Sequence, residues 1–488
     1  MRKKNGFLKE DPATKYEQNL RYEKVFSAAG NLKNLCYNMY AVGCYGLLMN
    51  MNDIKRRSMK AFLSALCMGL LGGISVSAQS PEQPDGAGNA ASPYQIKSIG
   101  NLLWMSMNTF SSQGTYYEIA ADIDASETSS WYGGQGFQPI GSESSHFRGK
   151  IIGKNHTISN LSINRAMSPH VGLLGFVEGG SVENLNLKNC TVSGQMYAGI
   201  LAGYMNGSSV TGCKVSGKVS CYGNYAGGIV GQAYQTPISK SCADQISVYG
   251  ANYVGGIVGE NLAGSTLAYC YSVGSVANNN GTYAGGLTGW SHEKISICYS
   301  RTTVSGSDRV GGLAGQSSNP IEQCYAAGNV YGQSNAGGLA GYSGRDITNS
   351  YWDKQLSGLE VCIGSDTSFG KNLGLTTQQM KQRNSYAGWD FNSVWGMSSS
   401  FNNGYPYLKG FTGANSFLGE SDIYFSTGED GLILEWLAEK KGKLEYSQDL
   451  VEWQTIPDAF IQEQNKYNIF KADSISTTAG KLFFRLAL

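Results

Sequence analysis

The sequence predicts an all-β protein whose main part is a parallel β-helix, a solenoid of about seven coils. The first observation behind this prediction is a glycine motif that recurs through the middle of the chain. Its closing glycines fall at 175, 203, 231, 259, 289, 315 and 341, so the steps are 28, 28, 28, 30, 26 and 26 residues. The second observation is the composition, with 65 glycines and only 15% charged residues. A fixed period indicates repeats that stack on one another, and this composition suits a tightly turning β structure.

Each full copy of the glycine motif has six residues, as in Ala226-Gly227-Gly228-Ile229-Val230-Gly231. The first and fourth residues are apolar in every full copy, although plain strand alternation would place residues three apart on opposite faces. If both face the core, the chain must bend between them, and we expect the glycines to permit that bend. The other copies span 198–203, 254–259, 284–289, 310–315 and 336–341, with a shorter one at 171–175.

A second pattern follows each glycine motif: an apolar residue and then, a few residues later, usually a cysteine. A third short segment comes next, so one repeat is expected to hold three short strands. Equivalent atoms of adjacent coils should lie about 4.8 Å apart with parallel side chains, a geometry that strains a disulfide and does not gather metal ligands. We therefore expect a buried ladder of unbonded cysteines and no metal site. The pairs are Val210…Cys213, Ile238…Cys242, Leu267…Cys270, Ile295…Cys298 and Ile321…Cys324.

The motif copies resemble the GLUG repeat, which is named for a Gly-Leu-hydrophobic-Gly core and occurs in bacterial surface proteins. Leu313-Ala314-Gly315 and Leu339-Ala340-Gly341 match that core, each after a glycine. The flanks are similar too, as in Ser350-Tyr351-Trp352-Asp353, but Ile152-Gly153-Lys154 stands where relatives usually carry Asp-Gly. The resemblance covers about residues 90–412. It implies a solenoid of an adhesin-like protein, although the repeat also occurs beside a secreted peptidase domain.

The start of the chain has the marks of export. Lys55-Arg56-Arg57 and Lys60 precede an apolar run over 61–74 and then small residues up to Ala78. This order of charged, apolar and small residues is typical of a signal peptide over 59–78, cleaved near Ala78. We expect residues 1–58 to be an over-extended start or disordered. The mature protein is then expected to be secreted or on the bacterial cell surface.

The rest of the chain is divided by composition. Residues 79–93 are predicted to be a linker, and 94–165 an N-terminal cap with the first coil. The cap includes a helical stretch over 96–107 with Ile96, Ile99, Leu103 and Met107 on one stripe. The repeats occupy 166–352. An aromatic-rich segment over 353–412 is expected to cap the other end, followed by a linker over 413–420 and a small β-sandwich-like module over 421–488.

Four tyrosines are the candidate ligand-binding residues: Tyr197, Tyr225, Tyr253 and Tyr283 each precede the first residue of a glycine motif. The later copies carry Arg309 and Asn335 there, so this position is expected to face outward. A strip of stacked aromatic side chains can bind sugar rings or partner proteins. The alternative is a cross-strand ladder that only stabilises the sheet.

The sequence does not indicate catalysis. His292-Glu293 is not followed by the second histidine of a zinc peptidase motif. The acids of the repeats stand at differing repeat positions, so no catalytic pair is evident. We expect a non-catalytic protein that binds a glycan or a host or matrix protein; the alternative is a polysaccharide-acting β-helix lyase or glycoside hydrolase, which needs two nearby acids. The acids of the repeats are Asp244, Glu260, Glu293, Asp308 and Glu322.

Partners and cofactors are limited by charge and by hydropathy. The net charge is +1, which gives no reason to expect a nucleic-acid partner. The apolar run at 61–74 is short for a transmembrane helix, so an integral membrane protein is not expected. No motif for a metal or another cofactor is present, and none is expected.

Overall fold

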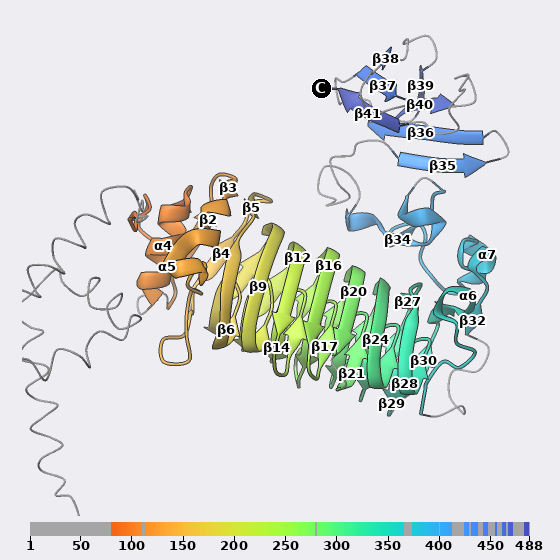
Figure 1. Cartoon of the computed structure of the whole chain (residues 1–488), viewed down its shortest axis with the longest axis horizontal. Coiled ribbons are helices and arrows are strands. Elements are labelled where there is room, and N and C mark those ends of the chain that lie inside the picture. Colours follow the sequence, from red (N-terminus) through yellow and green to blue (C-terminus); the bar gives the residue numbers. More distant parts are fainter. Residues whose placement is uncertain are drawn as a thin grey trace, which may run out of the picture. The chain divides into compact units, whose positions relative to one another are not determined.

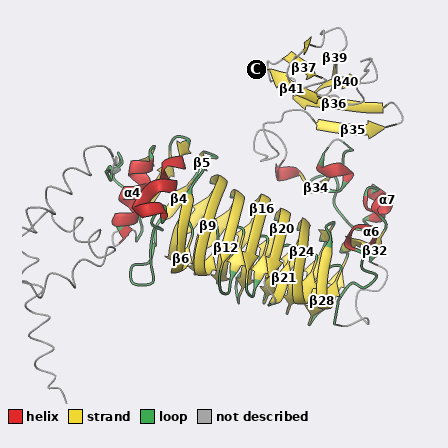
Figure 2. Cartoon of the chain, viewed as in Figure 1, coloured by secondary structure: helices red, strands yellow, loops and turns green. Residues whose placement is uncertain are grey.

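The computed structural model describes residues 80–109, 113–278, 281–365, 373–399 and 401–411, and the backbone of further strands between 424 and 487. The expected signal peptide, the segment before it and the linker at 413–420 lie outside these residues. Strands make up most of the described chain, and its few helices are short (Figure 2). No described helix is long and apolar enough to span a membrane.

A parallel β-solenoid forms the body of the protein, as predicted. Successive coils lie side by side along it (Figure 1), and their strands form three parallel sheets. The seven-stranded sheet takes its strands from the glycine motifs and the residues after them, so it confirms about seven coils. We call it the motif sheet. The other two are named the short-strand sheet and the long-strand sheet.

The motif sheet runs through β7 (Leu174–Glu178), β10 (Ala202–Asn206), β14 (Val230–Tyr234), β18 (Val258–Asn261), β22 (Thr288–Ser291), β25 (Ala314–Ser317) and β29 (Ala340–Ser343). The short-strand sheet runs through β1 (Tyr94–Ile96), β2 (Tyr116–Ile119), β4 (Lys150–Ile152), β8 (Ser181–Glu183), β11 (Ser209–Thr211), β15 (Ile238–Ser239), β19 (Leu267–Ala268), β23 (Ile295–Ser296), β26 (Ile321–Glu322) and β30 (Ile347–Thr348). The long-strand sheet contains β3 (Ile123–Asp124), β5 (Thr157–Ser159), β6 (Ser162–Val171), β9 (Asn186–Ala198), β12 (Lys214–Cys221), β13 (Ala226–Gly227), β16 (Cys242–Gly250), β17 (Val254–Gly255), β20 (Tyr271–Asn278), β21 (Thr282–Gly285), β24 (Tyr299–Gly311), β27 (Tyr325–Ala326), β28 (Val330–Gly337), β31 (Tyr351–Asp353) and β32 (Gly374–Leu375).

The glycine motif bends as expected, but its glycines serve a different purpose from the one we predicted. Ala226 and Ile229 are both fully buried, and the chain turns between β13 and β14. The left-handed residue of this corner is Tyr225, at φ 70°, one place before the motif. Gly228 is needed because the next coil is too close: a Cβ there would lie 2.1 Å from the carbonyl oxygen of Gly256. Close approach of backbones is therefore what the glycines allow.

The cysteine ladder is buried and unbonded, as predicted, but one of its members was assigned wrongly. All eight cysteines of the described residues are buried free thiols. Cys242 pairs in register with Lys214 and Tyr271, one place away from the ladder. Ser241 takes the rung instead, because Ile238…Cys242 is one residue longer than the other pairs. The thiols and hydroxyls of the ladder accept hydrogen bonds from the preceding coil: Cys213 N donates to Ser241 Oγ at 3.1 Å, and Cys270 N donates to Cys298 Sγ at 3.3 Å.

Replacing Cys298 by serine and by valine should separate the two roles of its thiol, as a hydrogen-bond acceptor and as a space-filling group. Serine keeps an acceptor for the buried N–H of Cys270, and we expect it to change the free energy of unfolding by less than about 1 kcal/mol. Valine fills the space but leaves that N–H without an acceptor, at a cost of about 1–3 kcal/mol. Chemical denaturation of both variants measures the difference. Equal stabilities would show that the thiol acts only as a space-filling group.

A short helix closes the N-terminal end of the core. α4 (Ile99–Met107) begins at Ser98, whose hydroxyl accepts from Asn101 N while the Asn101 side chain accepts from Ser98 N. Ile99, Leu102 and Met105 are buried with the first coils. Met107, which we expected on the buried stripe, is 53% exposed, because the helix ends there. The short turns η4 (Ser126–Ser130) and α5 (Trp131–Gly134) come later in the same end of the chain.

The aromatic-rich segment after the repeats divides into two parts, where we expected one cap. Its first part continues the last coil: Leu339 N donates to Cys362 O at 3.0 Å, and Ile363 bridges to Ala340. Its second part, residues 373–411, packs against the outer side of the long-strand sheet, and we call it the flank segment. The elements here are α6 (Lys354–Ser357), α7 (Thr377–Met380), η5 (Arg383–Ser385), β33 (Trp395–Gly396), η6 (Asn402–Gly404), β34 (Tyr407–Leu408) and η7 (Lys409–Phe411).

The flank segment covers a stack of buried tyrosines, which explains its position. The rings of Tyr271, Tyr299 and Tyr325 stack at 4.7 and 5.0 Å between centroids, each one place after a ladder rung. Left uncovered, these outward rings would form an apolar strip. Trp395 is fully buried against Tyr299 and Tyr325, and the Tyr325 hydroxyl donates to Pro406 O at 2.6 Å.

The last strands of the chain form two antiparallel sheets of their own. One is ordered β35 (Tyr424–Gly428), β36 (Gly431–Leu437), β40 (Tyr467–Lys471) and β39 (Ile461–Gln464). The other is ordered β38 (Gln454–Thr455), β37 (Lys443–Ser447) and β41 (Phe483–Ala487). Two small antiparallel sheets agree with the β-sandwich-like module that the alternating residues predicted.

Candidate functional site: a tyrosine ladder and the cavity at its end

The four candidate tyrosines form one continuous stack along a corner of the solenoid. The centroids of Tyr197, Tyr225, Tyr253 and Tyr283 are 4.8, 4.9 and 4.8 Å apart, and successive rings are inclined by 6–17°. His170 extends the stack by one coil, with its ring 4.7 Å from that of Tyr197. We call these five residues the corner ladder. All five side chains are partly exposed.

Each rung of the corner ladder has a left-handed backbone. The φ angles are 53° at His170, 52° at Tyr197, 70° at Tyr225, 55° at Tyr253 and 68° at Tyr283. Such a conformation is uncommon for bulky residues and costs of order 1–3 kcal/mol each. Asn335 occupies the equivalent corner in a later coil at φ 47°, and asparagine tolerates this region best among residues with a side chain. The sequence shows the Tyr-to-Asn exchange but not the backbone strain behind it.

Stacking decides which parts of the rings a ligand can reach. The flat faces of the inner tyrosines are covered by their neighbours, so the ladder presents ring edges and hydroxyl groups. At the far end, the Arg309 guanidinium lies over the Tyr283 ring at 5.0 Å from its centroid and donates to the Tyr283 hydroxyl. Burial raises the pKa of Tyr225 to about 12, with the nearby Glu260 carboxylate adding to the shift. That phenol is therefore neutral at ordinary pH.

A second column of side chains runs beside the corner ladder on the motif sheet. Trp290 belongs to it, and its ring stacks on Tyr283 at 5.2 Å and on His292 at 4.4 Å. Our sequence reasoning missed this column, although its signal is simple: each member directly follows the closing glycine of a motif. The members are Phe176, Tyr204, Gln232, Glu260, Trp290, Gln316 and Tyr342.

Glu260 is the acid of the second column and is nearly buried, at 6% exposure. Its carboxylate accepts from the Gln232 side-chain amide, and its other oxygen lies 3.3 Å from His292 Nε2. The other acids of the repeats have different partners. Glu293 accepts from Gly264 N, Glu322 pairs with Lys294, and Asp308 accepts from Asn335. Asp244 is 1% exposed, and burial raises the pKa of its carboxyl group.

A cavity of about 550 Å³ opens at the N-terminal end of the corner ladder. One wall is the loop 138–144 and the other is the end of β6, from Arg165 to the first rung, His170. Burial lowers the pKa of His170, so its ring favours the neutral form. Glu143 is the only acid among the lining residues. Its negative charge partly offsets the lowering of the His170 pKa, and it adds to the rise that burial causes in the Tyr197 pKa. We call this space the ladder-end cavity.

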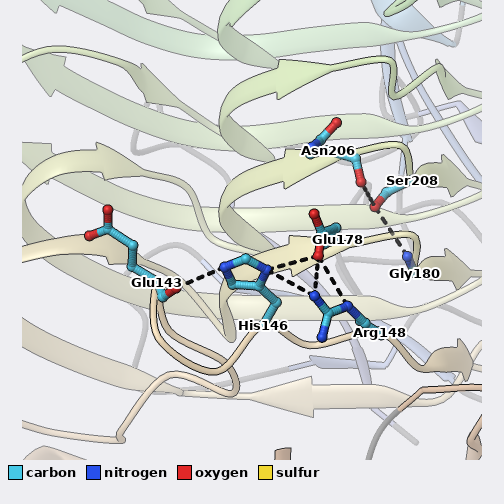
Figure 3. Close-up of polar contacts among 7 residues, drawn as sticks. All are labelled: Glu143, His146, Arg148, Glu178, Gly180, Asn206 and Ser208. Atoms are coloured by element: carbon cyan, nitrogen blue, oxygen red, sulfur yellow. Dashed lines mark hydrogen bonds and ion pairs between the residues drawn. The ribbon is translucent and has the colours of Figure 1, made fainter. Parts of the chain in front are cut away.

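Polar contacts hold the loop that walls the cavity. His146 lies between Glu143 and Glu178: its Nδ1 is 2.9 Å from Glu178 Oε2 and its Nε2 is 2.8 Å from the Glu143 backbone oxygen (Figure 3). Arg148 Nε donates to the same Glu178 oxygen at 3.0 Å. The Glu143 side chain points away from this cluster (Figure 3). The same loop also borders a smaller cavity of about 180 Å³.

Across the residues that the structure describes, no group of three or more His, Cys, Asp or Glu side chains is placed to hold a metal ion. The polar side chains near the ladder are instead arranged in pairs or small clusters around single acids. What the surface offers chemically is a row of aromatic edges and hydroxyls, a polar column beside it, and an open cavity with one carboxylate.

These features define a β-solenoid with an aromatic corner, and comparison with known proteins finds similarity to parts of two relatives. No protein-family model matches the chain. "Halomucin" from Haloquadratum walsbyi is 39% identical over 152 residues, which is 30% of this chain and 2% of that protein. A "Putative Gly-rich membrane protein" from Evansella cellulosilytica is 32% identical over 127 residues, 25% of this chain and 14% of that protein. The chain therefore spans only a small part of these relatives.

Two solved structures are also similar at low identity. One is titled as a putative immunoglobulin A1 protease from Bacteroides ovatus, with a TM-score of 0.45 and 20% identity over 67% of this chain and 95% of that one. The other, titled IgA1 protease, has a TM-score of 0.34 and 19% identity over 53% of this chain and 19% of that one.

Proposed function

We propose that this protein is a non-catalytic, adhesin-like binding protein of the GLUG-repeat type, secreted or displayed on the bacterial surface. It presents one rigid corner of a β-solenoid to a glycan or to a host or matrix protein. The observation that carries the proposal is the corner ladder with its second column, an aromatic and polar surface repeated at every coil. Repetition turns weak single contacts into useful avidity. The names of the two partial relatives, "Halomucin" and "Putative Gly-rich membrane protein", support a place at the cell surface.

The alternative of a polysaccharide-cleaving enzyme has less support. A glycosidase needs two carboxyl groups flanking the bond, about 5–10 Å apart. Glu260 beside the ladder is buried and already bonded to Gln232 and His292, and Glu178 near the cavity is bonded to His146 and Arg148. These acids support the architecture of the surface. Release of reducing ends from a polysaccharide by the full chain would favour the enzyme.

Replacing all four ladder tyrosines by asparagine should weaken binding without unfolding the protein. The change removes the hydroxyl row, while asparagine relieves the left-handed strain and already occupies this corner at Asn335. We expect at least about a tenfold loss of affinity, because several weak contacts are lost together. Binding of the full chain to a glycan array and to immobilised matrix proteins measures this effect.

The control carries the same change at three exposed tyrosines that are not part of the corner ladder. Tyr222, Tyr249 and Tyr331 are 66%, 40% and 60% exposed, and their replacement by asparagine should leave binding intact. Equal binding by both variants would place the contact surface elsewhere. Loss of cooperative unfolding in the ladder variant alone would make the ladder a structural element.

A further inference from the structure

The corner ladder ends at His170, which lines the ladder-end cavity. Tyr197 covers one face of His170, so the opposite face is turned toward the preceding coil. That coil passes through the loop 138–144, because Ile140 bridges in parallel to Leu174. The ladder-end cavity therefore lies where one more rung would stack. At the other end of the ladder, Arg309 covers the last ring, so the two ends differ.

The cavity combines this ring face with groups that suit a sugar. Pro139 and Pro169 add rigid apolar surfaces on the two walls, and Ser142 and Ser144 supply hydroxyl groups. The exposed Glu143 carboxylate has no hydrogen-bond partner among the described residues, and Glu143 lines the same cavity as His170. A carboxylate beside a flat neutral ring can accept from vicinal hydroxyls while the ring contacts C–H groups.

The walls of the cavity are fixed before any ligand arrives. Ile140 N donates to Leu173 O at 2.9 Å, and Ser142 and Ser145 exchange backbone hydrogen bonds at 2.8 and 3.1 Å. Arg165 Nε donates to Phe137 O at 3.1 Å, which joins the two walls. His146 and Arg148 hold the loop from its other side through Glu178. A preformed site loses less conformational entropy on binding.

We propose that the ladder-end cavity binds one neutral pyranose residue of a glycan. The His170 ring contacts the apolar face of the sugar, and the Glu143 carboxylate accepts from its hydroxyls. The cavity is lined by one cationic side chain, Arg165, and one anionic side chain, Glu143, so neither an acidic nor a basic sugar is favoured over a neutral one. This inference rests on the proposed function, because it names the ligand class for the same binding face.

Ligand-observed NMR titration of the full chain tests the proposal. The probes are the methyl glycosides of glucose, galactose, mannose and N-acetylglucosamine, with N-acetylneuraminic acid and lysine amide as charged probes. We expect at least one neutral glycoside to bind, and Glu143→Gln to weaken it about tenfold through loss of a charged acceptor. His170→Asn should remove the ring platform and abolish the signal. Tyr331→Asn, a change at an exposed tyrosine that is not part of the corner ladder or the cavity, should leave glycoside binding unchanged.

The outcomes separate this proposal from the general function. Silence of all four neutral glycosides, or binding unchanged in both cavity variants, would overturn it. Tighter binding of N-acetylneuraminic acid would overturn it in favour of an acidic sugar held by Arg165. Binding of lysine amide alone, lost in Glu143→Gln, would point to a basic peptide. If the four-tyrosine variant keeps its surface binding while the cavity binds a sugar, only the broader ladder function fails.

Discussion

Replacing Gly228 by alanine adds one methyl group between two coils. We expect it to destabilise the solenoid more than the other single substitutions described above. The new Cβ would lie 2.1 Å from the Gly256 carbonyl oxygen and 3.1 Å from the Ala243 Cβ. Both neighbours belong to the core of the next coil and cannot turn away. Overpacking against backbone forces the coils apart, and we expect a loss of about 3 kcal/mol or more in the free energy of unfolding. Urea denaturation followed by circular dichroism measures it.

Gly344→Ala is the matched control. Gly344 lies on the exposed side of the last coils, and the nearest atoms to its added Cβ are 3.9 Å away. Neither Gly228 nor Gly344 has a positive φ, so both substitutions test space and not backbone freedom. Alanine at 344 should therefore change stability by less than about 0.5 kcal/mol. A Gly228→Ala protein as stable as this control would contradict the close packing of coils.

Trp395→Ala should release the flank segment from the solenoid. Trp395 is fully buried, stacks on Trp389 at 4.3 Å and packs against Tyr299 and Tyr325 of the long-strand sheet. Removal of so large a buried ring costs about 3–5 kcal/mol. The loss falls on the flank segment, so we expect trypsin to cleave at Lys381, Arg383 and Lys409 well before it attacks the coils. Mass spectrometry of the early fragments gives the sites.

Trp395→Phe provides the comparison for this experiment. The indole Nε1 of Trp395 is buried without a hydrogen-bond partner, so phenylalanine loses volume but also removes an unsatisfied donor. We expect it to keep the flank segment resistant to trypsin. If trypsin also cleaves the phenylalanine variant early, a buried aromatic ring of any kind is not enough to hold the segment. The particular shape of the tryptophan side chain would then be required.

The repeating part of the fold could be predicted from sequence because each coil meets the same neighbours. The period of the glycines predicted the positions of the strands in the motif sheet. The ladder tyrosines could be assigned to one corner because each stands directly before a motif. The register of Cys242 was wrong because one inserted residue shifts a rung, and only pairing with Lys214 and Tyr271 reveals it. The left-handed φ of Tyr225 could not be inferred from residue type, since bulky residues rarely adopt it.

The non-repeating parts were less predictable for a physical reason. The position of the flank segment depends on the buried tyrosine stack that begins at Tyr271. Tyr271 precedes Trp395 by 124 residues in the chain. The ladder-end cavity depends on a loop that has no counterpart in the other coils. The flank segment and the cavity both depend on contacts between segments whose sequence patterns are unrelated. The repeat period of the sequence carries no information about such contacts.

The even spacing of the closing glycines has a consequence for how such a chain can change its length. Removing residues 232–259 would join Gly231 to Glu260 and leave every strand in an equivalent position, one coil shorter by about 4.8 Å. Duplication of that stretch would lengthen the stack equally. The coils from Tyr271 onward are fixed in number by the flank segment that spans them. Gains and losses of whole coils should therefore concentrate in the first half of the solenoid. There they change the distance between the two ends of the solenoid but leave the structure of each end unchanged.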